Sequence, residues 1–329
     1  MSTYHMSFFK ELNFYRFAIM GVAMISIILF HQYFVSVFPF NIFHNYGHWG
    51  VDVFLFLSGA GLVNSLKRYS LRNYYKRRLN RILPSCLVCG TMKYTAFVIL
   101  GSSVAVLEDG LKLGVWSILC LDSWFVYTIL LFYIISPLLY RLLCKHAITT
   151  LIVVVSIFFI NGLMVRPMVG YDWMSIHGIL SWSLERLPVF IIGMLMAVKE
   201  FEAWKLVHIL KMSFVFFVVA VSLIALVKFD VSFLAQQSLT FFLLALGMPS
   251  FISIIIYFLR CLPKIMLKPL SFFGSYSFEI YLAHGFIFWT FKIIFEGYNP
   301  WILLSICFLL TCVIAYVVKQ SVNRLKNFH

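Results

Sequence analysis

Long apolar stretches recur along the whole of this 329-residue chain, and short polar connections separate them. Stretches of roughly 18 or more apolar residues are long enough to cross a bilayer as helices. The pattern predicts an all-α polytopic membrane bundle with about ten transmembrane helices, at residues 14–38, 50–66, 82–100, 123–140, 148–165, 186–199, 212–228, 236–258, 271–291 and 300–318. Because every connection is short, we expect a single transmembrane domain over 1–329.

The basic residues are distributed unevenly between the two sides of this predicted bundle. Ten spans put both termini on one side, and that side receives twenty of the 26 Lys and Arg residues. Cytoplasmic connections of membrane proteins carry an excess of Lys and Arg, so both termini are predicted to be cytoplasmic. The formal net charge of +14 follows from this topology. Nucleic acid is therefore not expected as a partner.

Composition supports the membrane class. The chain is 62% hydrophobic and 12% charged, whereas soluble domains contain about 45–50% apolar and about 25% charged residues. Its seven cysteines lie mostly within apolar runs, where free cysteine behaves as a small hydrophobic residue. The CxxC at Cys86 and Cys89 is therefore interpreted as a pair of structural thiols, and no metal is expected.

His31 is the first candidate for chemistry, because it is an ionisable residue near the end of the first apolar span. Ionisable groups inside spans usually face a bundle interior or an aqueous cavity, and they mark functional sites. Arg16 precedes it by fifteen positions, which places the two residues on one helical face but about 22 Å apart. They cannot touch. This geometry suits a long ligand with an anionic end near Arg16 and its reactive group near His31.

A dense basic segment is the second candidate. Seven cationic residues fall within 67–81, and Arg78 and Arg81 form an R-x-x-R pair on one helical face. Such a segment can anchor the topology or bind anionic membrane lipid. Guanidinium groups also match phosphate oxygens in a bidentate manner. The second interpretation makes Arg78 and Arg81 candidates for binding a phosphate-bearing cofactor.

Two buried acids complete the candidate set. Asp52 begins the second span, where it either orients His31 for base chemistry or is a helix N-terminal acid favoured by the dipole. Glu279 lies five residues before His284 in one apolar span, so these two do not share a face, whereas Tyr281 and His284 do. Asp52 and Glu279 are predicted to orient or stabilise polar groups in a cavity.

Six stretches then carry a resemblance to a known family. They are "ILFH", "GVDVFLFLSGAGL", "YYKRRLNRILP", "WFVYTILLFYIISPLL", "RLPVFIIGMLMA" and "SFFGSYSFEIYLAH", in this order between residues 28 and 284. In this order they resemble the acyltransferase-3 family, integral membrane O-acyltransferases similar to bacterial O-antigen and exopolysaccharide O-acetylases. The likeness extends over nearly the whole chain, from about residue 11 to 318.

The resemblance implies a function and a set of site residues. It implies transfer of an acetyl or other short acyl group from cytoplasmic acyl-CoA, usually acetyl-CoA, to a sugar hydroxyl of a surface polysaccharide or lipid-linked glycan. The implied location is the cytoplasmic (inner) membrane of a bacterium. His31 matches the catalytic histidine, Arg16 its partner, and Arg78 with Arg81 the motif for the acyl donor. The spacing from Arg16 to His31 is four positions longer than the family pattern, about one helical turn.

Two questions stay open at the level of sequence. His31 acts either as a general base or as a transient acyl carrier. The alternative function is a multi-span transporter or exporter of a glycan, an organic anion or a metal, with a histidine-lined pore. His44 and His48 have a spacing compatible with zinc if they are helical, but no thiolate or carboxylate cluster completes such a site.

Overall fold

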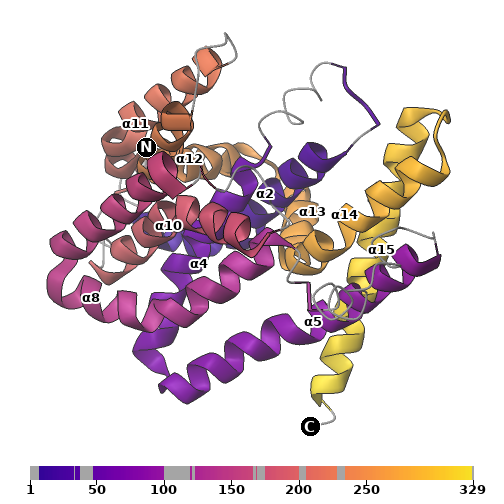
Figure 1. The fold of residues 1–329 in the computed structure, drawn as a ribbon, viewed down its shortest axis with the longest axis horizontal. Helices are drawn as coiled ribbons and strands as arrows, with labels where there is room; N and C mark the ends of the chain where they lie inside the picture. The colour runs from indigo at the N-terminus through magenta and orange to yellow at the C-terminus, as the bar shows by residue number, and fades with distance from the viewer. Residues whose placement is uncertain are drawn as a thin grey trace. The chain divides into compact units, whose positions relative to one another are not determined.

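The computed structural model describes residues 7–32, 34–37, 47–99, 119–120, 123–165, 168, 175–199, 205–227 and 234–327. Within these ranges the regular elements are all helices and no strand is formed (Figure 1), which confirms the predicted all-α class. His44, most of the 101–122 connection and most of residues 166–174 lie outside the described residues.

The helices follow the apolar periodicity of the sequence. In chain order they are α1 (Phe8–Phe14), α2 (Arg16–His31), α4 (Trp49–Arg68), α5 (Leu71–Ile99), α8 (Trp124–Ile160), the π-helix η2 (Asn161–Val165), α10 (Ile176–Val198), α11 (Leu206–Val227), α12 (Leu234–Cys261), α13 (Lys264–Ser275), α14 (Ser277–Ile294) and α15 (Pro300–Asn327).

Several of these helices are suited to a bilayer. Among the described residues six are long and apolar enough to cross one, or seven if the bent pair α1 and α2 counts as one span. The protein is therefore a multi-pass membrane protein. One of the six, which begins at Trp124, is interrupted by non-helical backbone at His146, between the predicted spans 123–140 and 148–165. The count of ten and the cytoplasmic termini stay predictions.

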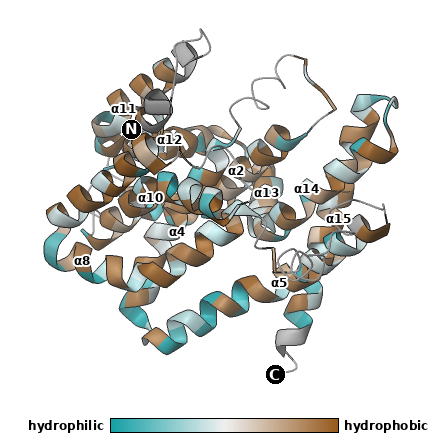
Figure 2. Cartoon of the chain, viewed as in Figure 1, coloured by the Kyte–Doolittle hydropathy of each residue, from teal (hydrophilic) through white to brown (hydrophobic). Residues whose placement is uncertain are grey.

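The helix ends differ from the bounds of several predicted spans, and three of these differences bear on the site. The predicted span 271–291 is two helices, α13 and α14, separated at Tyr276. Helix α10 begins at Ile176 instead of residue 186, because the Ser175 hydroxyl accepts a hydrogen bond from the Gly178 amide and caps the helix there. Helix α5 begins at Leu71 instead of residue 82, so the basic segment is helical. Figure 2 shows this segment of α5 as hydrophilic and the end of the helix as hydrophobic.

The chain divides into two compact units, each assembled from three stretches. The first unit comprises 1–19, 52–75 and 124–267, and in it α10 packs against α8 and α12 while α11 packs against α12. Helix α4 approaches α10 closely through glycines. A Cβ atom at Gly59 would collide with the Phe190 carbonyl oxygen, and one at Gly193 with that of Phe56. Small residues that let two backbones approach closely are typical of helix interfaces in membrane proteins.

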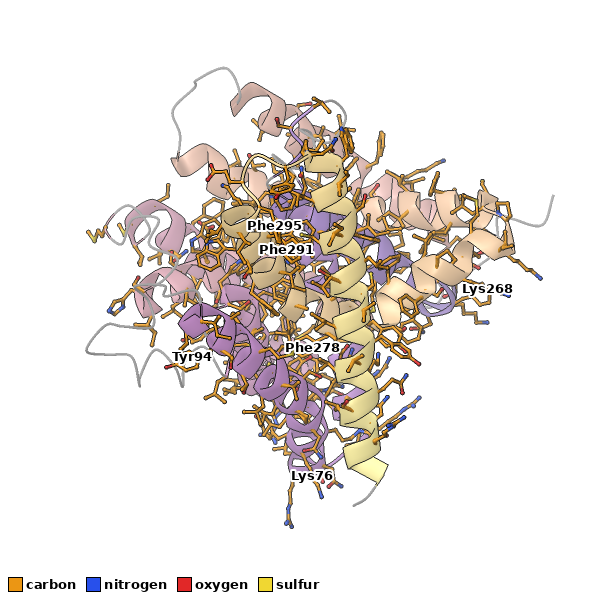
Figure 3. All side chains as sticks on the ribbon, turned by 90° about the vertical axis from the view of Figure 1, so that its right-hand side faces the viewer. Lys76, Tyr94, Lys268, Phe278, Phe291 and Phe295 are labelled. Carbon is orange, nitrogen blue, oxygen red and sulfur yellow. The ribbon has the colours of Figure 1, made fainter. Side chains whose placement is uncertain are left out.

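The second unit comprises 20–51, 76–123 and 268–329. It contains most of α2, most of α5, and helices α14 and α15, which pack against each other (Figure 3). Cys86 and Cys89 are buried in this unit as free thiols, in agreement with the interpretation of the CxxC as structural. This unit also contains His31 and the basic pair Arg78 and Arg81.

Candidate functional site

His31 is the last residue of α2, and its side chain is half-buried. The Nδ1 atom lies 3.0 Å from the Ile27 carbonyl oxygen, one turn back on the same helix. It also lies 3.2 Å from Nε2 of His284. The Nδ1 atom of the histidine predicted to be the reactive group thus has two neighbours within hydrogen-bond distance.

His284 is the second member of this pair. It is buried in the first half of α14, and its Nδ1 atom lies 2.7 Å from the Tyr281 carbonyl oxygen and 3.2 Å from that of Ile280. The centroids of the two imidazole rings are 4.9 Å apart, with an interplanar angle of 69°. Tyr281 and His284 meet as predicted from their i, i+3 spacing, with ring centroids 5.4 Å apart.

Glu279 points to a different neighbour. The Ser85 hydroxyl, on α5, donates a hydrogen bond of 3.0 Å to Oε1 of Glu279, and both side chains are buried. Two residues further along α14, the Tyr281 hydroxyl lies 3.1 Å from that of Ser123. The five-residue separation of Glu279 and His284 therefore sends one side chain to α5 and the other to α2, which agrees with the predicted difference in face.

The basic pair lies on the same helix as Ser85. Arg78 is half-buried and Arg81 is exposed, and Arg81 precedes Ser85 by about one helical turn. In Figure 3, Lys76 of α5 lies at one end of the view, Phe278 of α14 lies further in, and Phe291 and Phe295 lie beyond it. Along α5 and then α14, the Arg pair comes first, the Ser85–Glu279 contact follows, and the His31–His284 pair comes last.

Asp52 and Arg186 form a buried ion pair in the first unit. Nη1 of Arg186 donates to both carboxylate oxygens of Asp52, at 3.0 and 2.9 Å, and each side chain is 3% exposed. The guanidinium also lies 4.0 Å from the Phe241 ring centroid, which is cation–π geometry. Arg186 finds this partner on α4, because residues adjacent on one helix do not face each other. Orientation of His31 by Asp52 stays a prediction.

Arg16 is the first residue of α2, at the opposite end of that helix from His31. Its Nη2 atom donates a hydrogen bond of 3.1 Å to the Leu57 carbonyl oxygen on α4, and the guanidinium lies against Gly61. A Cβ atom at Gly61 would lie 3.1 Å from Nη2 of Arg16, so glycine gives the guanidinium room at this position. A role for Arg16 in binding the acyl donor stays a prediction.

The partnership of His31 with His284 is the feature that sequence reasoning missed. In the sequence, His284 is an ionisable residue of an apolar span that shares a helical face with Tyr281. The available signal was its position one turn after Tyr281 in an otherwise apolar helix. Linear sequence does not show that a helix 253 positions away meets the end of α2.

The described residues define a multi-pass helical membrane protein with a paired imidazole at the end of α2 and an arginine pair on α5. Comparison with known families identifies its class. The family model of the acyltransferase-3 family, described as an acyltransferase domain, matches residues 18–319. The chain belongs to this family and is a membrane acyltransferase. No curated protein and no solved structure matches it.

Proposed function

We propose that this protein is an O-acyltransferase that moves an acetyl or other short acyl group from cytoplasmic acyl-CoA to a sugar hydroxyl of a surface or exported glycan. Family membership supports the acyl transfer. The observation that carries the proposal is the contact of 3.2 Å between Nδ1 of His31 and Nε2 of His284, because a paired, half-buried imidazole is suited to general base chemistry on a hydroxyl group.

The donor is held by α5 in this proposal. Arg78 and Arg81 bind the phosphate groups of acyl-CoA, since guanidinium groups pair with phosphate oxygens in a bidentate manner. The pantetheine arm then follows α5 past Ser85 and Glu279 toward the end of α2. The order of these residues along α5 and α14 supports that course.

The reaction is a direct transfer. His31 removes the proton from the sugar hydroxyl as its oxygen attacks the thioester carbonyl carbon. The new C–O ester bond forms, the C–S bond breaks, and the electron pair leaves with the sulfur of coenzyme A. The proton held by His31 then passes to that thiolate, so that free coenzyme A and the acylated sugar are released and the imidazole is regenerated.

The topology supports the proposed location. The basic segment on α5 belongs to the side predicted to be cytoplasmic, where acyl-CoA is available, and His31 belongs to the outer half of the first span. This arrangement suits the inner membrane of a bacterium, with the donor entering from the cytoplasm and the glycan from outside. Anionic membrane lipid is a further partner for the basic segment.

The test compares the surface glycans of cells with and without the protein by mass spectrometry. We expect the protein to add one acyl mass per modified sugar, and we expect His31→Ala to abolish this addition while the protein remains folded in the membrane. His208→Ala, a change at an exposed histidine of α11, is the matched control and leaves the modification unchanged. Normal acylation with His31→Ala would overturn the assignment of the base.

A second measurement separates transfer from transport. Purified protein is incubated with acetyl-CoA that carries a radiolabelled acetyl group and with polysaccharide isolated from cells that lack the protein. Label in the polysaccharide supports the transferase. Intact acetyl-CoA, together with a loss of glycan export in the deletion strain, would favour an exporter.

A further inference from the structure

We propose that His284 is a positioning residue that holds His31 in the tautomer with the proton on Nδ1, so that the Nε2 atom of His31 carries the lone pair and receives the hydroxyl proton. The inference rests on the proposed acyl transfer and adds to it a residue with a defined task. It follows from the identity of the atoms that lie near Nδ1 of His31 and near both ring nitrogens of His284.

The tautomer of His284 is determined by the backbone of α14. Its Nδ1 atom is within 2.7 Å of the Tyr281 carbonyl oxygen and 3.2 Å of that of Ile280. A carbonyl oxygen accepts hydrogen bonds and cannot donate them. The Nδ1 atom therefore carries the proton and donates, and in the neutral imidazole Nε2 is left as an acceptor that faces His31.

The tautomer of His31 follows from two acceptors. Its Nδ1 atom lies between the Ile27 carbonyl oxygen at 3.0 Å and Nε2 of His284 at 3.2 Å. Neither of these atoms has a proton to offer, so Nδ1 of His31 is the donor to both. The neutral ring then has its lone pair on Nε2, the nitrogen on the side of the ring away from His284.

This arrangement also assists the reaction. When His31 takes the hydroxyl proton it becomes an imidazolium, and its Nδ1–H bond to His284 becomes charge-assisted and stronger. The proton stays on His31, because His284 is only 3% exposed and burial penalises a charge more strongly there than on the half-buried His31. His284 thus acts through His31 and does not itself exchange a proton with substrate.

The direct test uses the wild-type protein without substrate. Nitrogen-15 NMR of protein labelled at histidine, in lipid bilayers at about pH 8 where a histidine of ordinary pKa is neutral, distinguishes protonated from unprotonated ring nitrogens. The spectrum of His31→Ala identifies the His31 signals. We expect protonated Nδ1 and unprotonated Nε2 for both residues. A His31 ring with its proton on Nε2 would overturn the proposal, whether or not acyl transfer is detected.

The kinetic test compares two substitutions of His284. His284→Gln keeps an acceptor oxygen for the Nδ1–H group of His31, and His284→Leu removes it. For transfer from acetyl-CoA to isolated polysaccharide we expect His284→Leu to lower kcat about 10- to 100-fold, the loss of one charge-assisted hydrogen bond, with little change in the KM for acetyl-CoA. We expect His284→Gln to restore most of kcat.

The controls separate the possible failures. His208→Leu on α11 should leave kcat unchanged. Equal losses in His284→Leu and His284→Gln, or a loss confined to KM, would contradict the positioning role. Absence of transfer by the wild-type enzyme would instead refute the proposed function, and the NMR measurement would still decide the tautomer. It also decides the question if His284→Leu does not fold.

Discussion

Breaking the buried ion pair between Asp52 and Arg186 should be among the most destabilising single changes in the first unit. The substitution Asp52→Asn keeps the shape of the side chain but removes the charge that faces Arg186. Arg186 would keep its own charge, with only 3% of its side chain exposed to solvent. An uncompensated buried charge is costly because water no longer solvates it and no counter-ion replaces water.

The magnitude follows from the geometry. Nη1 of Arg186 makes contacts of 3.0 and 2.9 Å with the two oxygens of Asp52, and removing one partner of such a buried pair costs about 3–5 kcal/mol. The contact of Arg186 with the Phe241 ring survives the substitution and offsets a minor part of this cost. We therefore expect Asp52→Asn to lower the free energy of unfolding by about 3 kcal/mol or more.

The chain contains a matched control. Arg260 and Glu11 form a looser pair, with 3.6 Å between Nε and Oε2 and with 18% of the Arg260 side chain exposed. Glu11 is buried, with 4% of its side chain exposed, but Glu11→Gln should cost less than Asp52→Asn because the Arg260 charge left behind is partly solvated. Replacing both buried partners, with Asp52→Leu and Arg186→Met, should restore much of the stability lost in Asp52→Asn, since an apolar pair leaves no charge behind.

The assay is unfolding of the purified protein in mixed micelles, followed by far-ultraviolet circular dichroism as denaturing detergent is added. Destabilisation by Asp52→Asn no larger than that by Glu11→Gln would refute the reasoning. So would costs of the single variants Asp52→Leu and Arg186→Met that simply add in the double variant, because the interaction energy of a real pair appears as non-additivity.

Two further predictions concern other parts of the molecule. Changing Arg78 and Arg81 together to Gln should weaken coenzyme A binding by several kcal/mol, since each charge-assisted hydrogen bond contributes about 1.5–3 kcal/mol. Isothermal titration calorimetry measures the affinity, with Lys76→Gln as the single-charge control. Unchanged affinity in the double variant would mean that the segment only sets the membrane topology. Gly59→Ala should destabilise the protein because the new Cβ atom would meet the backbone of α10. Gly285→Ala, whose Cβ atom would meet nothing within 4 Å, should be neutral or stabilise the protein by up to about 1 kcal/mol through helix propensity. Thermal melting compares the two variants, and equal effects would contradict the close approach of α4 and α10.

The sequence predicted the class of fold well and the helix ends poorly. Hydropathy is summed over many residues, so it locates apolar helices even when single positions deviate. Helix ends depend on a few local interactions. The Ser175 cap extends α10 by ten residues, and the break at Tyr276 divides a run that reads as continuous. Neither feature changes the average apolar character of its segment, which is why the periodicity did not show it.

The chemical type of the candidate residues was enough to identify them in the sequence. It was not enough to identify the residues that they contact. His31, Asp52 and Glu279 stand out because an ionisable group is costly in an apolar span. Each has a partner on another helix, namely His284, Arg186 and Ser85. Closeness in sequence does not reveal such partners, because Asp52 and Arg186 are 134 positions apart.

By itself, the sequence determined that this is a multi-pass helical membrane protein, and it identified a histidine, two acids and a basic helix as its unusual groups. Those properties depend on the cost of placing each residue type in an apolar environment, which is local information. Only the tertiary structure decided which groups meet. The two histidines are 253 positions apart and the ion pair 134, and such contacts depend on how helices rotate and approach as they pack, which the close approach at Gly59 illustrates.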